Sequence, residues 1–289
     1  MTLSGASPRQ ARRLTPLLTL KGSTGIGTWN VRTLYEVGKA AQVVSKIRQY
    51  NISVLAICES RWNGAGQVTL AIGERLLYSG HEEEQHAHVK GVALMLSESA
   101  AKALIECNPV SPRILMARFN SKGRKVAIIN CYAPTNNTAD GQKEEFYGSL
   151  QVVLDHAPRR DIKILLGDFN AKICRDNTGK ERAMRRQGSG CMRENGERAV
   201  YRLSHWWEHF PPQCHSQGHV DLPGWTNFKP RYIDHITIAW KWRTSLMDVR
   251  VKRGTDAAFD HHLLLGTFKV KLVWAIVFHL LSHIVNTTS

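Results

Sequence analysis

The stretch IKILLGDFN, residues 162–170, decides how we interpret the fold of this chain. Its first five residues form a short, mostly apolar run that is typical of a buried strand. The carboxylate of Asp168 and the carboxamide of Asn170 follow where that strand ends. Enzymes with open α/β sheets or β-sandwiches usually place their chemistry at such positions. Because a Gly-Asp turn after a strand is commonly structural, the motif predicts a functional site only in combination with others.

Apolar runs elsewhere predict further strands, and apolar residues at helical spacing predict two helices. The expected strands are 26–29, 52–58, 89–96, 114–119, 125–131, 162–166, 233–239 and 263–270, and the expected helices are 37–50 and 144–156. The turn at 121–123 lies between two of these strands, so we expect them to pair as a hairpin. Strands outnumber helices, which favours two packed sheets with helices on the outside.

The length of 289 residues predicts one large domain, which we place at residues 25–272. Residues 1–24 are basic and lack the apolar core of a secretory signal, so we expect a disordered leader, with a transit peptide as the weaker alternative. An apolar tail occupies residues 273–289. The apolar segment 272–285 is short for a membrane span and contains His279 and His283, so a membrane anchor is not favoured.

The charge and the cysteines indicate the kind of partner and the compartment. The formal net charge is +15, which favours a polyanionic partner, nucleic acid before a membrane surface, although solubility alone also explains it. The six cysteines lack the C-x-x-C spacing of a zinc site, and we interpret them as reduced thiols of an intracellular protein of the nucleus or cytoplasm. A zinc set built from Cys191, Cys214, His215 and His219 matches no standard finger.

Polar side chains suited to metal binding or proton transfer occur at the ends of six predicted strands. They are Asn30, Glu59, Tyr132, Asp168 with Asn170, Asp234, and Asp260 with His261. Taken singly, each has a structural explanation, such as a turn cap for Asn30 or an ion pair with Arg231 for Asp234. Together they favour a metal-dependent phosphoester site, because phosphodiester hydrolysis needs a cation, a positioned water and a donor to the phosphate.

At these positions the sequence resembles the endonuclease/exonuclease/phosphatase superfamily. The strings that carry the resemblance are GTWNVRTL (27–34), CYAPTN (131–136), GDFNAKI (167–173), IDHI (233–236) and DHHLL (260–264). The resemblance is greatest to the apurinic-type endonuclease domains of non-LTR retrotransposons, which also occur in craniofacial-development-protein-2-like sequences. It implies an α/β (α+β) four-layer sandwich of two packed mixed β-sheets flanked by helices. It also implies magnesium-dependent nicking of DNA by a protein that we expect to be a monomer.

The resemblance implies a role for each residue on the metal side. Glu59 would be the principal ligand of Mg²⁺, or alternatively Mn²⁺, with Asn30 and Asp260 nearby; such ions prefer oxygen ligands. Asp168 would orient the attacking water and accept its proton. Asn170 would hold that water or a phosphate oxygen.

The same resemblance assigns the phosphate side. His261 would donate to the phosphate oxygens opposite the metal, and Asp234 would orient its imidazole and raise its pKa. Tyr132 would donate to the phosphate. Arg61 replaces a lysine common in repair enzymes and would contact phosphate with both arms of its guanidinium.

Two departures from the family pattern bear on activity. Phe259 stands where the family usually has a serine, directly before the Asp-His pair. Residues 201–229 show neither helical nor strand periodicity. Read one base later with permitted codons, this segment resembles the missing family sequence, so we hypothesise that it is translated out of the ancestral frame. The alternatives to an active nicking enzyme are therefore an inactive nucleic-acid-binding relic, or a repair-type apurinic endonuclease or phosphatase.

Two further charged segments have competing interpretations. The loop 81–88 is rich in histidine and glutamate and could bind metal, but a solvated hairpin loop is the simpler reading. The basic stretch 175–186 could follow a DNA backbone or form a mobile charged loop.

Overall fold

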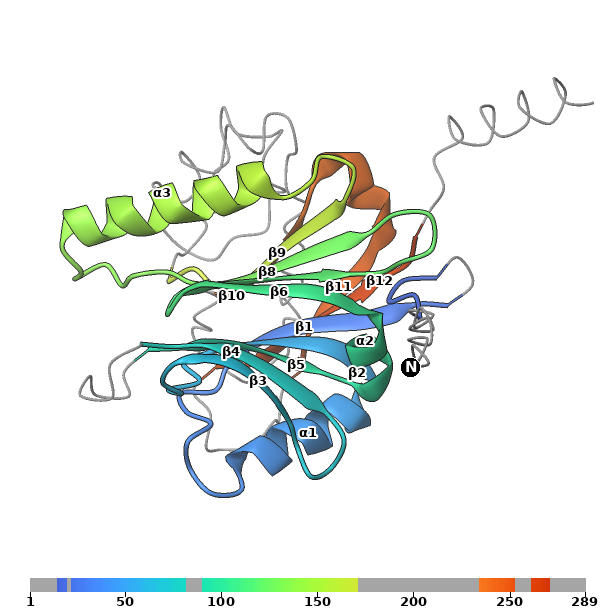
Figure 1. The fold of residues 1–289 in the computed structure, drawn as a ribbon, viewed down its shortest axis with the longest axis horizontal. Helices are drawn as coiled ribbons and strands as arrows, with labels where there is room; N and C mark the ends of the chain where they lie inside the picture. Colours follow the sequence, from blue (N-terminus) through green and yellow to red (C-terminus); the bar gives the residue numbers. More distant parts are fainter. Residues whose placement is uncertain (1–14, 20–21, 82–89, 171–233, 253–260, 271–289) are drawn as a thin grey trace, which may run out of the picture.

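The computed structural model describes residues 15–19, 22–81, 90–170, 234–252 and 261–270, which form two β-sheets and their helices (Figure 1). The seven-stranded sheet has the order β11 (Leu246–Lys252), β12 (Leu263–Phe268), β1 (Thr24–Asn30), β2 (Ile52–Cys58), β5 (Val92–Leu96), β4 (Arg75–Ser79) and β3 (Ala65–Thr69). The five-stranded sheet has the order β10 (Asp234–Ile238), β9 (Ile162–Asp168), β8 (Val126–Tyr132), β7 (Ile114–Phe119) and β6 (Leu104–Ser111).

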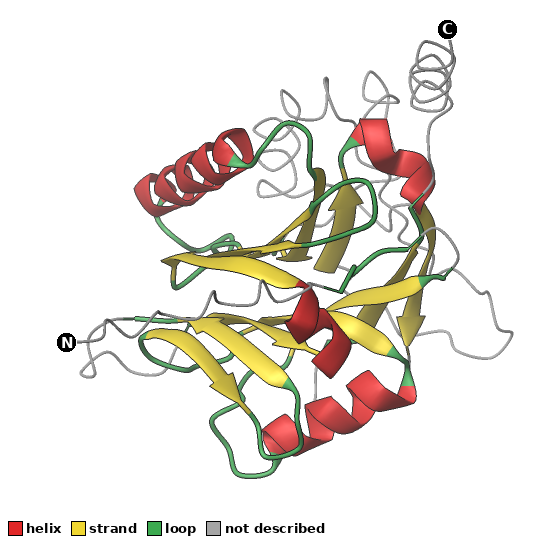
Figure 2. Cartoon of the chain, turned by 45° about the vertical axis from the view of Figure 1, so that its right-hand side comes forward, coloured by secondary structure: helices red, strands yellow, loops and turns green. Residues whose placement is uncertain are grey.

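The two sheets pack face to face, and the long helices cover their outer faces (Figures 1 and 2). The helices are α1 (Lys39–Gln49), α2 (Glu98–Ala103), α3 (Asp140–His156) and the 3₁₀ helix η1 (Trp240–Ser245). α1 presents Val43, Val44 and Ile47 to the seven-stranded sheet, where they pack in one cluster with outward-facing apolar residues. A second cluster joins the inner faces of both sheets and includes the apolar side of α3. The predicted four-layer sandwich with two mixed sheets is confirmed.

Strand direction brings one end of each sheet to the same edge of the molecule. β1 and β2 run parallel, as do β8 and β9, so the carboxyl ends within each pair lie side by side. β10 is antiparallel to β9, and β12 is antiparallel to β1, so these two strands begin at that same edge. This edge therefore collects the residues at the carboxyl ends of β1, β2, β8 and β9 and the residues at the amino ends of β10 and β12.

The apolar runs located most of the inner strands, and the predicted hairpin is confirmed by the antiparallel pairing of β7 with β8. Four strands occur where none was predicted: β3, β4, β6 and β11. Of these, β3, β6 and β11 lie at sheet edges, and β3 and β6 are largely exposed, so burial imposes little apolar pattern on them. β6 also contains Pro109, which edge strands tolerate because one side of the strand needs no donor.

Residues before position 25 contribute to the core. Leu17 and Leu18 are buried in the core, and the backbone N–H of Leu17 donates to the carbonyl of Asn120 at 2.7 Å. Part of the expected leader therefore packs against the turn after β7. Residues 1–14, 201–229, 273–289, the basic stretch 175–186 and most of the loop 81–88 lie outside the described residues. No helix among the described residues has the length and hydropathy needed to cross a membrane.

Asn130 links the two sheets through a buried side chain. It belongs to β8, yet its Nδ2 donates to the carbonyl of Ile57 in β2 at 2.9 Å and to that of Ala93 in β5 at 3.0 Å. Its side chain is fully buried, so no water replaces these bonds. Asn130 therefore fixes how the five-stranded sheet sits on the seven-stranded one.

We expect Asn130→Leu to lower the free energy of unfolding by about 2 kcal/mol, because both buried amide hydrogen bonds are lost. Urea unfolding followed by circular dichroism measures this change. Asn108→Leu is the matched control, since Asn108 is exposed on edge strand β6. Equal effects of the two substitutions would contradict the inter-sheet role.

Candidate functional site

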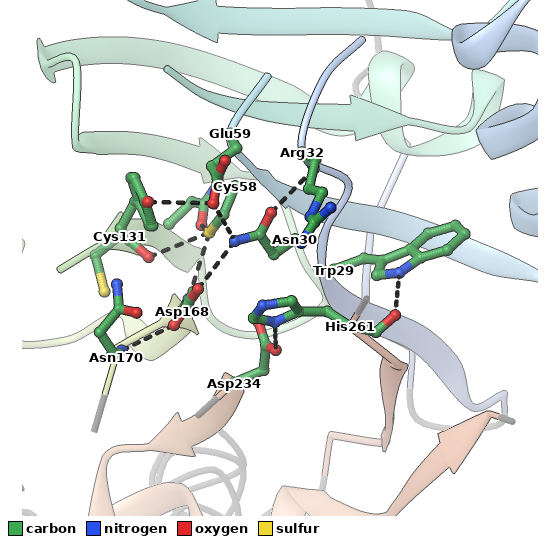
Figure 3. A network of polar contacts seen from close by, with 12 residues as sticks. Trp29, Asn30, Arg32, Cys58, Glu59, Cys131, Asp168, Asn170, Asp234 and His261 are labelled. Atoms are coloured by element: carbon green, nitrogen blue, oxygen red, sulfur yellow. Dashed lines mark hydrogen bonds and ion pairs between the residues drawn. The ribbon is translucent and has the colours of Figure 1, made fainter. Parts of the chain in front are cut away.

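Asn30 bridges two carboxylates at the edge where the strand ends meet (Figure 3). Its Nδ2 donates to Oε1 of Glu59 at 2.8 Å and to Oδ2 of Asp168 at 3.0 Å. Its Oδ1 accepts from the backbone N–H of Arg32 at 3.0 Å. Because Asn30 ends β1, Glu59 directly follows β2 and Asp168 ends β9, one amide joins the two sheets to each other at the site.

The backbone at this edge is held in an unusual conformation. Five non-glycine residues among those described have positive φ, and four of them flank the site: Arg32, Glu59, Arg61 and Asn170, with φ of 60°, 57°, 57° and 47°. Such left-handed backbone costs about 1 kcal/mol or more per residue and persists where surrounding contacts enforce it. Gly167, with φ of 137°, approaches Cys131 so closely that a side-chain carbon there would overlap its carbonyl. Only glycine satisfies both conditions immediately before Asp168.

Two hydrogen-bond donors hold Oε1 of Glu59, and the guanidinium of Arg61 faces its Oε2. Tyr132 donates its hydroxyl to Oε1 at 3.1 Å, and Nη2 of Arg61 lies 3.7 Å from Oε2. Burial raises the pKa of the Tyr132 hydroxyl, and the charges of Glu59 and Asp168 raise it further. Tyr132 therefore remains a protonated donor across the physiological pH range.

Asp168 is buried, with 1% of its surface exposed, and two hydrogen bonds from backbone N–H groups fix its position. Its N–H donates to the sulfur of Cys58 at 3.3 Å, and its Oδ1 accepts from the N–H of Asn170 at 2.8 Å. Burial and the charge of Asp234 raise the pKa of Asp168 to about 7, despite opposing contributions from His261 and Asn30. A carboxylate with this pKa accepts a proton readily near neutral pH.

His261 and Asp234 form a pair beside Asp168. Nδ1 of His261 lies 2.8 Å from Oδ2 of Asp234, and the indole N–H of Trp29 donates to the His261 carbonyl at 2.9 Å. Burial lowers the pKa of His261, but the hydrogen bond and charge of Asp234, together with Asp168 and Glu59, outweigh it and raise the pKa to about 9. The imidazole is therefore charged at neutral pH and leaves Nε2 as a donor.

The donor set fits a hard divalent cation. Two alternative sets of ligands are available. In one set, an oxygen or nitrogen atom from each of Asp168, Asp234 and His261 lies within 4.8 Å of the other two. In the other set, Glu59 provides the oxygen ligand. We favour the oxygen of Glu59 over that trio, since Nδ1 of His261 and Oδ2 of Asp234 already occupy each other. A cation at Glu59 would also offset the charge of the half-buried Glu59 and the buried Asp168, which a single amide bridges.

The structure brings eight of the nine predicted site residues to one edge. They are Asn30, Glu59, Arg61, Tyr132, Asp168, Asn170, Asp234 and His261. Asp260 and the neighbouring Phe259 lie outside the described residues. Two side chains are oriented differently from expectation: Asn30 turns its nitrogen to Glu59, and Asn170 donates its Nδ2 to the Ala133 carbonyl at 2.8 Å.

Sequence reasoning missed Arg113, Cys58 and Trp29 as contributors to the site. Arg113 precedes β7, and Nη1 donates to the carbonyl of Tyr132 at 2.9 Å. Nothing in its local pattern distinguished it from a surface arginine. Cys58 and Trp29 occur within apolar runs next to Glu59 and Asn30, where a core role was sufficient explanation.

Comparison with known proteins agrees with this geometry. A match to the endonuclease/exonuclease/phosphatase family covers residues 27–245. Craniofacial development protein 2 of Bos taurus is 32% identical over 254 residues, which are 86% of this chain and 41% of that protein. The chain thus spans less than half the length of this curated relative.

Two solved structures share the fold. The endonuclease domain of TRAS1, a telomere-specific non-LTR retrotransposon, aligns with a TM-score of 0.59 at 14% identity, covering 86% of this chain and all of that one. A 3′ phosphatase from Neisseria, solved with a product DNA hairpin, aligns with a TM-score of 0.59 at 20% identity and the same coverage. At these identities the likeness shows the fold alone.

We expect His261 to titrate near pH 9 in chelator-treated protein, and Asp234→Asn to lower its pKa toward the ordinary 6.5. A raised pKa stabilises the fold below the unfolded value and loses that contribution as pH rises through 9. Asp234→Asn should therefore destabilise the protein more at pH 6 than at pH 10. Histidine NMR titration and urea unfolding measure the two effects.

Asp248→Asn is the control, because Asp248 lies on β11 and pairs with Arg250. It should leave the His261 titration unchanged. A His261 pKa near 6.5 in the unsubstituted protein would refute the assigned pairing.

Proposed function

Since the chain belongs to the endonuclease/exonuclease/phosphatase family, we propose that it is a metal-dependent phosphodiester hydrolase that nicks DNA, as a retrotransposon-type endonuclease does. One observation carries the proposal: a bridged pair of carboxylates, Glu59 and Asp168, faces the His261–Asp234 pair at one edge of both sheets. We assign to this edge a cation site, a proton acceptor and a charged donor.

Glu59 is the proposed holder of Mg²⁺, with Mn²⁺ as a substitute, and Asp260 is the proposed second carboxylate. A bound divalent cation offsets negative charge that develops on phosphate and leaving-group oxygens. Asn30 is better suited to bridging than to coordination, because its oxygen is occupied by the Arg32 N–H and its nitrogen faces Glu59. Asn30 would then keep Glu59 and Asp168 at a fixed separation.

Asp168 is the proposed acceptor of the proton from the attacking water. Its carboxylate is fixed on one side by Asn30 and on the other by the Asn170 N–H. A group held in this way presents a constant direction to a water, and misplacement by about 1 Å costs roughly a hundredfold in rate. The Asn170 side chain contributes by tying the loop after β9 to Ala133.

His261, Tyr132 and Arg61 are the proposed donors to the phosphate. The charged imidazole, oriented by Asp234, donates from Nε2 to a phosphate oxygen. Tyr132 and Arg61 already surround Glu59 and would contact the same phosphate group from the side of β8 and β2. Their positive or donor character matches the charge of a phosphodiester.

DNA is the proposed substrate for two reasons. The net charge of +15 favours a polyanion over a small phosphate ester. Structures with the same fold include a retrotransposon endonuclease domain and a phosphatase bound to a DNA hairpin.

Asp168→Asn should reduce Mg²⁺-dependent nicking of supercoiled plasmid by about 10²–10⁴-fold, because the proton acceptor is lost. Conversion to open-circular plasmid on agarose gels measures the rate. Asp155→Asn is the matched control, since Asp155 is exposed on α3 and bonds only to Gln151 among the described residues. Thermal melting of both variants excludes unfolding as the cause.

Nicking assays run beside DNA-binding, abasic-duplex and 3′-phosphate-release assays distinguish the alternative functions. Salt-sensitive DNA binding without Asp168-dependent nicking would identify a binding relic and refute the nuclease. Cleavage restricted to duplexes with an abasic site would identify a repair-type endonuclease. Release of phosphate from a 3′-phosphorylated duplex, without internal nicks, would identify a phosphatase.

Glu59→Gln should raise the Mg²⁺ concentration needed for half-maximal nicking on the order of tenfold or more, because a charged ligand becomes neutral. A Mg²⁺ titration of the nicking rate measures this midpoint, and chelation with EDTA should abolish nicking in every variant. Glu98→Gln serves for comparison, since Glu98 is exposed on α2 and pairs with Lys102. An unchanged midpoint for Glu59→Gln would place the metal elsewhere.

A further inference from the structure

Cys58 is a fully buried cysteine at the end of β2, and its sulfur contacts the five-stranded sheet (Figure 3). The sulfur accepts the backbone N–H of Asp168 at 3.3 Å. It also lies 3.4 Å from the carbonyl oxygen of Cys131 and 3.7 Å from Oδ1 of Asn130, which are two acceptors on β8 for its single proton. Burial and the charge of Asp168 raise the pKa of the Cys58 thiol well above its ordinary value, so the thiol keeps that proton. Cys58 therefore acts as acceptor and donor between the two sheets.

The other polar groups of Asp168 show what this sulfur contributes. The Asp168 carbonyl accepts from the N–H of Ala133 at 2.8 Å, and its Oδ1 accepts from the N–H of Asn170, so these bonds tie it to its own sheet and loop. From the seven-stranded sheet, Asn30 holds the carboxylate and Cys58 holds the main chain. The sulfur therefore fixes the backbone of Asp168 against β2.

Cys58 directly precedes Glu59 in the chain. The proposed holder of the metal and the group that holds the main chain of the proposed proton acceptor thus belong to adjacent residues. Movement of Asp168 away from Cys58 would change its separation from Glu59. Because a displacement of about 1 Å costs roughly a hundredfold in rate, even a smaller movement would slow the reaction measurably.

We propose that Cys58 is a positioning residue, whose thiol holds the main chain of Asp168 and thereby sets the separation of Asp168 from Glu59. The inference rests on the proposed function, because it assigns both carboxylates to one reaction. Cys58 acts through Asp168 and is not itself a catalytic residue. Sulfur is a weak acceptor, but in this buried position it is the partner that the Asp168 N–H has, and a buried N–H without a partner is costly.

The test compares the kinetics of plasmid nicking at saturating Mg²⁺ over a series of plasmid concentrations. Cys58→Ala removes the acceptor, so we expect kcat to fall about tenfold or more. KM should change by less than about twofold, because the proposed phosphate donors stay in place. Cys58→Ser should recover part of the lost kcat, since a hydroxyl again accepts and donates.

Cys131→Ala is the matched control. Cys131 is an equally buried cysteine, and its sulfur forms no hydrogen bond within the described part of the chain. The substitution removes the same side-chain volume but keeps the carbonyl that faces Cys58. A loss of rate caused only by a cavity in the core would therefore appear in both variants. We expect kcat of Cys131→Ala to stay close to that of the unsubstituted protein.

Hydrogen exchange of the Asp168 amide, followed by NMR, measures the contact without catalysis. Cys58→Ala should speed this exchange about fivefold or more, because the amide loses its acceptor. Cys131→Ala should leave it unchanged. Cys58→Val keeps the apolar volume and suits a strand, so it carries both measurements if melting curves show that Cys58→Ala fails to fold.

The results that would overturn the inference differ in what else they remove. Equal kcat for the Cys58→Ala and Cys131→Ala proteins refutes the positioning role and leaves the nuclease proposal standing, whatever the amide exchange shows. A Cys58→Ser protein no faster than Cys58→Ala, or a rise in KM at constant kcat, has the same consequence. Absence of nicking by the unsubstituted protein refutes both proposals.

Discussion

The site depends on a buried polar connection between the two sheets. Asn130 reaches from β8 to backbone carbonyls of β2 and β5, and Cys58 accepts the Asp168 N–H across the same interface. Directional hydrogen bonds in a dry interior restrict the relative position of two packed sheets more narrowly than apolar contacts alone. Glu59 and Asp168 belong to different sheets, so their separation is set by this connection before any cation or substrate is present.

Several features that are energetically unfavourable in isolation lie together at the edge where this connection reaches the surface. Two carboxylates share one amide, a third carboxylate holds a charged imidazole, and the backbone at Glu59 and Asn170 is left-handed. Natural proteins retain such unfavourable features chiefly at functional sites. The two large apolar clusters of the sandwich stabilise the fold and offset the free-energy cost of this arrangement.

The inner strands could be predicted because burial requires a run of apolar residues. The polar residues at their ends could be predicted because they directly follow or precede such a run. Glu59 and Asp168 were found in this way, and antiparallel pairing explains why Asp234 and His261 arrive at the same edge. Edge strand β3 could not be predicted, since exposure removes its apolar pattern. Arg113 and the direction of the Asn30 amide are properties of contacts between distant segments, which no local spacing encodes.

The hydrogen bond from Trp29 to the His261 carbonyl spans 232 residues of sequence. β1, which carries Trp29, lies between β2 and β12, so one of its edges remains open until β12 has emerged from the ribosome. An open edge beside an apolar strand invites pairing with another chain. Completion of the site and protection of the nascent chain from aggregation are therefore the same late event in folding.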